Sequence, residues 1–459
     1  MLKKIQNKKT GLVIAILVLI LLIRLIYIFI YHDPVTSDSA QYDALAYNTM
    51  TGKGYSLNNS LSVSNVSNYA NEAKPSAWRP PGYPIFLISI YSIFGHNYNA
   101  VHIIQAIIAT ITGLLIYIIG KKAWNHEAAI SGVLFYAIWP PFVVLPAQLL
   151  TETLNNFLVT LSILILILLL EKPESTKLWI MLGIVCSYSA LVRPTYLLYA
   201  LFILPIIIIL FYTKISKNKI KFAKLDKKKS IKLIKGAAIF FLIFIAMIGV
   251  WTIRNNLEFG KPIMGSTQQG LGLFFGTVPF NTSINGNPNP DNPVFSSIFN
   301  TNKSEVEKSD LLTKEAINNI KKEPFKVLLI KIDNIYRIWN MPYISRSIDN
   351  DSYETLMDNN WVVRTFLPRG SFMFYLFLYT YIAIHVIIIL LFIASLFLEK
   401  WWLKKEIIFI YGIILYLNMI MFLTIGIDRY ILAIMPFVAI AATDLSIKIY
   451  KKLVNNKQI

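Results

Sequence analysis

The chain has 459 residues, of which 55% are hydrophobic and 15% are charged, and its mean hydropathy is +0.55. This balance excludes an ordinary soluble protein, a disordered chain and a collagen-like chain, because many separate apolar runs are long enough to cross about 30 Å of hydrocarbon. The net charge of +19 fits lysines retained on the cytoplasmic side of a membrane, so we expect membrane lipids and no nucleic acid as partners. Cys186 is the single cysteine, which excludes an intramolecular disulfide and a cysteine-based metal site.

Ten apolar runs predict an all-α polytopic membrane protein with about ten transmembrane helices. The first run follows four lysines and is too long for the apolar part of a signal peptide, so we expect a membrane helix with its N-terminus inside. Residues 128–170 could instead form one bent hairpin around Pro140, Pro141 and Pro146, so about nine to eleven spans fit the pattern. The runs lie at about residues 11–31, 100–120, 128–147, 149–170, 178–193, 195–212, 236–253, 371–398, 406–425 and 429–448.

Lysine-rich connections follow every second span, which predicts that both termini are cytoplasmic. Two long polar segments, residues 32–98 and 254–370, are then extracytoplasmic, and they divide the chain into regions 1–253, 254–370 and 371–459. The apolar stretch 84–94 is too short to span and is expected to lie along the membrane surface, and 304–340 is expected to be helical. The richness in Lys, Ile and Asn indicates a bacterial cell membrane. The basic inner segments are the N-terminal lysines, Lys121 with Lys122, 171–177, 214–235, 400–405 and the 451–452 tail.

Arginine is distributed differently from lysine. The sequence has nine arginines, and all but Arg24, which lies in the first span, fall on the predicted outer side. Because a guanidinium grips phosphate oxygens in a bidentate way, we expect a lipid phosphate at the outer headgroup level. For any single arginine, reaching to headgroups or pairing with a carboxylate explains the position equally well. The outer arginines are Arg79, Arg193, Arg254, Arg337, Arg346, Arg364, Arg369 and Arg429.

The first outer segment holds the main candidate for catalysis. Asp38 follows the first span closely, and a carboxylate there could take a proton from a hydroxyl or help to hold a divalent metal ion. The alternative is a helix N-cap formed by Ser37, Asp38 and Ser39, which is compatible with catalysis. We interpret Asp43 and Glu72 as solvated loop acids.

Other polar positions leave two interpretations open. Glu152 lies near the outer start of a span, where an ionisable residue indicates either a functional site or a partner for an arginine. His96 and His102 lack the spacing of metal ligands and are interpreted as structural. No glycine-rich phosphate loop or dinucleotide-binding fingerprint occurs in a strand-to-helix context, so an activated donor would come from the membrane.

The sequence resembles polytopic membrane glycosyltransferases of the GT-C class, in particular the protein mannosyltransferases of family 39 and the aminoarabinose transferases. The resemblance implies a polyprenyl-phosphate sugar as donor, an outer active site, and an inverting displacement in which Asp38 acts on the acceptor hydroxyl. It also implies that Arg79 and Arg429 bind the departing phosphate. Ser39 stands where many protein mannosyltransferases have Glu, which weakens the case for a protein acceptor. The matching pieces are Ser37-Asp38-Ser39 with Tyr42, Arg79 to Pro84 with Tyr83, Thr151-Glu152-Thr153, Leu191 to Thr195 with Arg193, Trp251 to Asn255 with Arg254, Phe259 to Pro262, Ser266-Thr267, and Asp428-Arg429-Tyr430 with Pro436.

The sequence therefore predicts a membrane glycosyltransferase that moves a hexosyl or pentosyl group to an acceptor hydroxyl. The acceptor could be a protein, a wall polymer or a glycolipid, and no cofactor beyond a divalent metal ion is expected. Two other classes stay open: a ligase or polymerase of lipid-linked oligosaccharides, and a transporter or flippase. The substrate-binding candidates beside the catalytic Asp38 are Tyr42, Arg79, Tyr83, Glu152, Arg193, Arg254 and Arg429.

Overall fold

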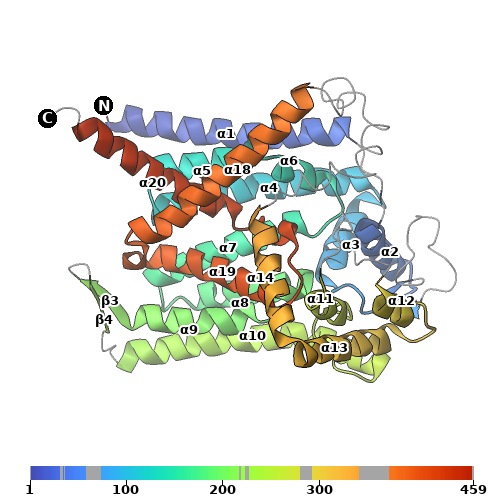
Figure 1. Cartoon of the computed structure of the whole chain (residues 1–459). Coiled ribbons are helices and arrows are strands. Elements are labelled where there is room, and N and C mark those ends of the chain that lie inside the picture. Colours follow the sequence, from blue (N-terminus) through green and yellow to red (C-terminus); the bar gives the residue numbers. More distant parts are fainter. Residues whose placement is uncertain are drawn as a thin grey trace.

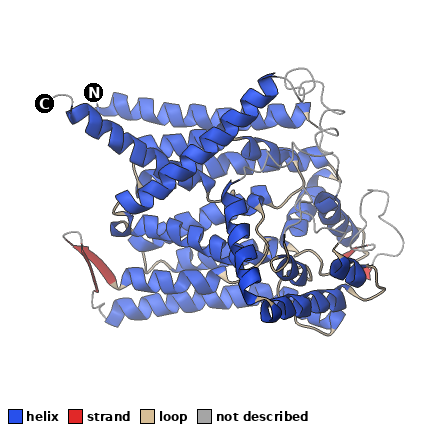
Figure 2. Ribbon diagram, viewed as in Figure 1, coloured by secondary structure: helices blue, strands red, loops and turns tan. Residues whose placement is uncertain are grey.

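A computed structural model describes residues 2–31, 35, 37–57, 74–216, 219–222, 227–279, 292–340 and 372–456. Almost all of its regular structure is helical, with two short antiparallel strand pairs (Figure 2). One pair joins β1 (Ser56–Leu57) to β2 (Lys74–Pro75), and the other joins β3 (Thr213–Ser216) to β4 (Lys219–Phe222).

Long apolar helices lie side by side and form the body of the molecule (Figure 1). Their shared core is built from Val, Ile, Leu, Phe and Tyr side chains, and many other apolar side chains point outward, as they do in a bundle surrounded by lipid. The helices of this body are α1 (Leu2–Ile30), α4 (Tyr98–Ala123), α5 (His126–Ile138), α7 (Glu152–Glu171), α8 (Thr176–Val192), α9 (Tyr199–Phe211), α10 (Lys227–Phe259), α18 (Phe372–Leu398), α19 (Lys405–Leu423) and α20 (Met435–Asn456).

Seven described helices are long and apolar enough to cross a membrane, and α5 with the following α6 (Pro140–Val144) and η2 (Leu145–Ala147) would make an eighth. The polytopic α-helical fold is confirmed, but the count of ten spans is not. Two of the ten runs differ from the expectation. Helix α8 has 17 residues, and the run from 429 begins with a short 3-10 turn, η5 (Asp428–Ile431), before α20 starts.

Helix α5 ends in a bend of 62° at the place where the sequence has two consecutive prolines. Pro140 and Pro141 lack the N–H groups that would bond the carbonyls of Tyr136 and Ala137 in a continuous helix. Arg24 of α1, fully buried, donates to both carbonyls, over 2.9 Å and 3.4 Å. An arginine from a neighbouring helix thus replaces the donors that the prolines remove.

The polar outer segments form a cap at one end of the body, on the right in Figure 1. From the first segment come α2 (Ser37–Met50) and α3 (Gly82–Phe94). From the second come α11 (Gln269–Phe275), α12 (Pro293–Phe299) and α13 (Glu305–Lys322), whereas α14 (Pro324–Asn340) runs from α13 over the body and packs against α19. The expected helical stretch 304–340 is therefore two helices, which separate before Pro324. Helix α10 continues past residue 253 and ends at Phe259, and the next residue, Gly260, has a φ of +67°, which suits glycine.

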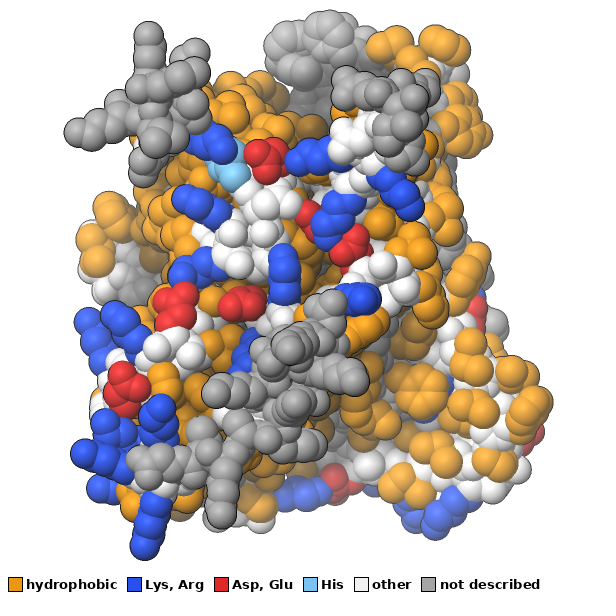
Figure 3. Space-filling view, turned by 90° about the vertical axis from the view of Figure 1, so that its left-hand side faces the viewer, with side chains coloured by type: hydrophobic (Ala, Val, Ile, Leu, Met, Phe, Trp, Pro, Cys, Tyr) orange, Lys and Arg blue, Asp and Glu red, His pale blue; other side chains and the backbone are white. Residues whose placement is uncertain are grey.

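Both termini and the β3–β4 hairpin lie at the opposite end of the body (Figure 1). This face carries many basic side chains (Figure 3). Exposed lysines at or beside the ends of α4, α19 and α20 are Lys121, Lys122, Lys404, Lys451 and Lys452. The connections in which the sequence concentrates lysine thus share one end, and the outer segments share the other.

Candidate active site

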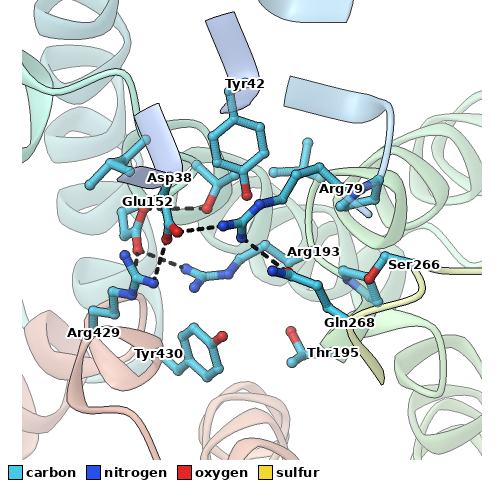
Figure 4. A pocket seen from close by; sticks show the side chains of 15 residues that line it. Asp38, Tyr42, Arg79, Glu152, Arg193, Thr195, Ser266, Gln268, Arg429 and Tyr430 are labelled. Carbon is cyan, nitrogen blue, oxygen red and sulfur yellow. Dashed lines mark hydrogen bonds and ion pairs between the residues drawn. The ribbon is translucent and has the colours of Figure 1, made fainter. Parts of the chain in front are cut away.

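A pocket lies between the cap and the ends of the long helices. It contains five charged side chains, and the rest of its wall is neutral (Figure 4). Six separate stretches of the chain contribute to it, which explains why no local motif describes it. The lining residues are Asp38, Tyr42, Arg79, Pro80, Leu150, Thr151, Glu152, Val192, Arg193, Pro194, Thr195, Ser266, Gln268, Arg429 and Tyr430.

Asp38 lies in the first turn of α2, and both of its carboxylate oxygens face arginines. Oδ1 accepts a hydrogen bond from Arg79, and Oδ2 accepts one from Arg429 over 2.8 Å. Burial alone would raise the pKa of Asp38, but the two guanidinium groups outweigh it and hold that pKa below the usual aspartate range. Asp38 is therefore ionised at neutral pH.

Arg79 is held on three sides. Besides its bond to Asp38, its Nε donates to Gln41 over 2.8 Å, and NH1 donates to Gln268 over 3.0 Å. The guanidinium also lies over the ring of Tyr42, 5.1 Å from its centroid. Each of the three nitrogens of Arg79 thus donates to a protein acceptor. Arg79 is therefore held in place and can hold Asp38 in turn.

Arg193 and Arg429 share a second carboxylate, that of Glu152. Its Oε1 lies 3.5 Å from Arg193 NH1 and 3.3 Å from Arg429 Nε, both longer than an ordinary hydrogen bond. Glu152 is 1% exposed and starts α7, where the helix dipole favours a negative charge. The guanidinium of Arg193 stacks on Tyr430, 4.1 Å from the ring centroid. This part of the cluster is more loosely paired than the part around Arg79.

A glycine brings the two halves of the cluster together. Gly82 begins α3 so close to α8 that a Cβ on it would lie 2.5 Å from the backbone nitrogen of Val192. Tyr188 of α8 also donates to the Gly82 carbonyl over 2.9 Å. Only glycine allows this approach, which places the segment carrying Arg79 beside the helix end carrying Arg193.

Two predicted substrate-binding residues lie outside the pocket. Arg254 donates to the carbonyls of Ser76 and Tyr55 over 2.8 Å and 2.9 Å, so it holds backbone. Tyr83 is buried behind Tyr42 and donates to Gln105 over 3.0 Å. The structure instead adds Gln41, Gln268 and Tyr430 to the site. Their partners come from distant segments, so the local sequence carried no signal for the two glutamines.

Asp43 is a correction to the sequence interpretation. It was expected to be a solvated acid, but it is 0% exposed and accepts hydrogen bonds from Tyr91 and Tyr98, each over 2.7 Å. Its Oδ1 also lies 2.8 Å from His96 Nε2. Asp43 therefore ties α2 to α3 and α4, and His96 has the structural role that we expected.

Three outer arginines, Arg346, Arg364 and Arg369, and the acid Glu72 lie outside the described residues. Arg337 is described, and it pairs with Asp333 one turn earlier on α14, over 2.5 Å, away from the pocket.

A divalent metal ion at Asp38 does not fit this arrangement, because both oxygens of Asp38 already face cations. Within the described part of the chain, no three or more His, Cys, Asp or Glu residues gather at a distance suited to a metal ion. We derive no step through a metal.

Comparison with known proteins supports the class that the fold indicates. Residues 78–251 match the family model described as dolichyl-phosphate-mannose-protein mannosyltransferase. No curated protein matches the chain significantly.

Among solved structures, the oligosaccharyltransferase of Archaeoglobus fulgidus in its apo form superposes with a TM-score of 0.52 at 12% identity, covering 98% of this chain and 52% of that one. The oligosaccharyltransferase AglB from the same organism, in complex with an inhibitory peptide and a dolichol-phosphate, gives a TM-score of 0.51 at 11% identity, with the same coverage. ArnT from Cupriavidus metallidurans bound to undecaprenyl phosphate gives 0.41 at 12% identity, covering 95% of this chain and 78% of that one.

The chain is a polytopic membrane protein with the GT-C fold, and the resemblance to GT-C glycosyltransferases is confirmed. It spans about half the length of the archaeal oligosaccharyltransferase chains.

Proposed function

We propose that this protein transfers a sugar from a polyprenyl-phosphate carrier to an acceptor hydroxyl in the pocket around Asp38. The observation that carries the proposal is the pairing of three arginines with two carboxylates in one pocket, which leaves an excess positive charge. A bound phosphate would balance that charge. The archaeal structure in complex with a dolichol-phosphate supports a lipid phosphate as a ligand of this fold.

The contacts suggest which arginines receive the phosphate. Each nitrogen of Arg79 already donates a hydrogen bond, to Asp38, Gln41 or Gln268. Arg193 meets Glu152 only at 3.5 Å, and Arg429, which also donates to Asp38, meets Glu152 at 3.3 Å. We therefore assign the phosphate to Arg193 and Arg429, with Glu152 holding both guanidinium groups in place. This revises the role that the resemblance gave to Arg79, which on this proposal positions Asp38.

In the proposed reaction the acceptor oxygen attacks C1 of the sugar while the bond from C1 to the phosphate oxygen breaks. The hydroxyl proton passes to Asp38, and the carrier phosphate leaves with the bonding electrons and a negative charge. Although Asp38 is a weak base, it can accept this proton because the acceptor oxygen becomes acidic as its bond to C1 forms. Arg193 and Arg429 stabilise the charge that develops on the phosphate.

The proposal places the pocket on the extracytoplasmic face and both termini in the cytoplasm. The lysine-rich face at the terminal end of the body supports this orientation, since positive residues collect on the cytoplasmic side. We infer a cell-membrane location for the whole protein.

The test replaces Asp38 by Asn, which removes the base and keeps the size. We expect the transfer of labelled sugar from undecaprenyl phosphate, measured in membranes that contain the native acceptor, to fall by roughly 10²-fold to 10³-fold at an unchanged protein level. The matched control is Asp310→Asn, because Asp310 is exposed and pairs with Lys261 outside the pocket. Near-normal transfer by Asp38→Asn would remove Asp38 from the mechanism.

A ligase of lipid-linked oligosaccharides is the second candidate, favoured by the similarity of the fold to an oligosaccharyltransferase. Both candidates need the same arginines. Supplying the membranes with monosaccharide-lipid and oligosaccharide-lipid donors in parallel separates them, because our proposal expects turnover of the monosaccharide donor.

A further inference from the structure

The segment that carries Arg79 is neither helix nor strand between residues 76 and 81, yet it is tightly fixed. Tyr55 donates to the carbonyls of Arg79 and Pro80, over 2.9 Å and 3.1 Å. Thr267 donates its backbone N–H to the Ala77 carbonyl over 2.9 Å. An irregular segment depends on such contacts for its position, because it has no ladder of its own hydrogen bonds.

Glu305 provides the contacts on the other side of this segment. Its Oε1 accepts the backbone N–H of Ala77 over 2.5 Å, and its Oε2 accepts the hydroxyl of Ser76 over 2.9 Å. Glu305 is the first residue of α13, directly after the N-cap Ser304. The capping box of Ser304 and Glu307 stabilises this helix start, from which the Glu305 side chain reaches Ser76 and Ala77.

Arg254 completes the arrangement from the end of α10. Its NH1 donates to the Ser76 carbonyl and its NH2 to the Tyr55 carbonyl, so it links the residue before β1 to the Arg79 segment. The rings of Tyr55, Trp251 and Phe259 surround its guanidinium, with centroids 5.3 to 5.5 Å away. Glu305 and Arg254 belong to the second polar segment, 254–370. Arg79 and Asp38 belong to the first, 32–98.

We propose that Glu305 and Arg254 are positioning residues that clamp the 76–81 backbone and thereby hold Arg79 against Asp38. Neither residue lines the pocket, so neither is expected to touch the sugar or the phosphate. The clamp makes the geometry of Asp38 depend on the second outer segment. Because the phosphate is assigned to Arg193 and Arg429, loss of the clamp lowers the rate of transfer and leaves phosphate affinity unchanged.

This inference rests on the proposed function, and Glu305→Ala tests it. At saturating donor we expect the transfer rate to fall by as much as about 10²-fold, the cost of a misplaced catalytic group. We expect the Kd for undecaprenyl phosphate, measured on the purified full-length protein in detergent, to stay within about twofold of the wild-type value. Glu305→Gln keeps an oxygen that can accept the Ala77 N–H, so it should restore most of the rate.

Asp310→Ala is the matched control, because it removes an exposed acid from the same helix, α13, and Asp310 pairs with Lys261. Its transfer rate should equal that of the wild-type protein. A wild-type rate in Glu305→Ala would overturn the clamp. A rise in Kd that accounts for the lost rate would overturn it too, as would an Asp310→Ala rate as low as that of Glu305→Ala. A wild-type protein that transfers no sugar and binds no undecaprenyl phosphate would instead contradict the proposed function.

Discussion

The guanidinium of Arg429 donates to Oδ2 of Asp38 over 2.8 Å, although 391 positions separate the two residues in the chain. Arg429 lies in η5, between α19 and α20, and Asp38 lies in the first turn of α2. The pocket therefore joins a segment near the start of the sequence to a segment near its end. The contact joins the proposed base to an arginine that also faces Glu152.

The first prediction concerns the pH dependence of transfer. An ordinary aspartate has a pKa of about 3.9. Arg79 and Arg429 lower the pKa of Asp38, so in the wild-type protein Asp38 loses its charge only at a pH below that value. Replacing Arg429 by Gln removes one cation and should raise the pKa of Asp38. The acid limb of the pH–rate profile should then move to higher pH.

The lowered pKa of Asp38 also predicts how the stability of the protein depends on pH. A carboxylate whose pKa is lower in the folded state stabilises the protein above its unfolded pKa, and this contribution is lost as the pH falls through the folded pKa. Arg429→Gln should therefore start to lose stability at a higher pH than the wild-type protein. Arg337→Gln is the control, since Arg337 pairs with Asp333 on α14. An acid limb that stays in place in Arg429→Gln would show that it does not report Asp38.

The second prediction concerns the phosphate. Arg193→Met removes a guanidinium with a long ion pair and a stack on Tyr430, and the Kd for undecaprenyl phosphate should rise by roughly 10-fold to 100-fold, as expected when a hydrogen bond to a charged group worth about 1.5–3 kcal/mol is lost. Arg193→Lys should recover part of the affinity, because it keeps the charge but not the planar fork.

Arg337→Met serves as the control for Arg193→Met, because it removes the same charge outside the pocket. Titration of the purified protein with undecaprenyl phosphate gives the comparison. Equal affinities in Arg193→Met and the wild-type protein would remove Arg193 from the phosphate site and return the phosphate to Arg79 and Arg429, the pair that the resemblance implied.

The sequence predicted the fold better than it predicted the site. A long apolar run predicts a helix directly, because a segment that crosses the hydrocarbon must satisfy its backbone hydrogen bonds within itself. The lysine pattern also predicted that the lysine-rich connections lie together, and in the structure they share one end of the body. The count of spans was less certain, since Pro140 and Pro141 break one run and α8 is short.

The site shows where local patterns fail. Arg193 and Arg254 both lie near helix ends and gave the same signal, yet Arg193 faces the pocket and Arg254 holds the backbone of another segment. Asp38 and Asp43 lie on the same short helix, and one faces the pocket while Tyr91 and Tyr98 cover the other. These differences are set by partners from distant helices, which spacing along one element does not reveal.

The last prediction concerns Arg24, the arginine inside the first span. Arg24→Met leaves the carbonyls of Tyr136 and Ala137 without its donors, and each buried carbonyl left unsatisfied costs about 1–3 kcal/mol. Pro140→Ala returns an N–H that can bond the Tyr136 carbonyl within the helix. Arg24→Met should therefore lower the melting temperature of the detergent-solubilised protein less in the Pro140→Ala background than alone. If the two losses were equal, Arg24 would not be acting as the donor that the prolines remove, and its burial would need another explanation, such as a role in moving an ion or a lipid.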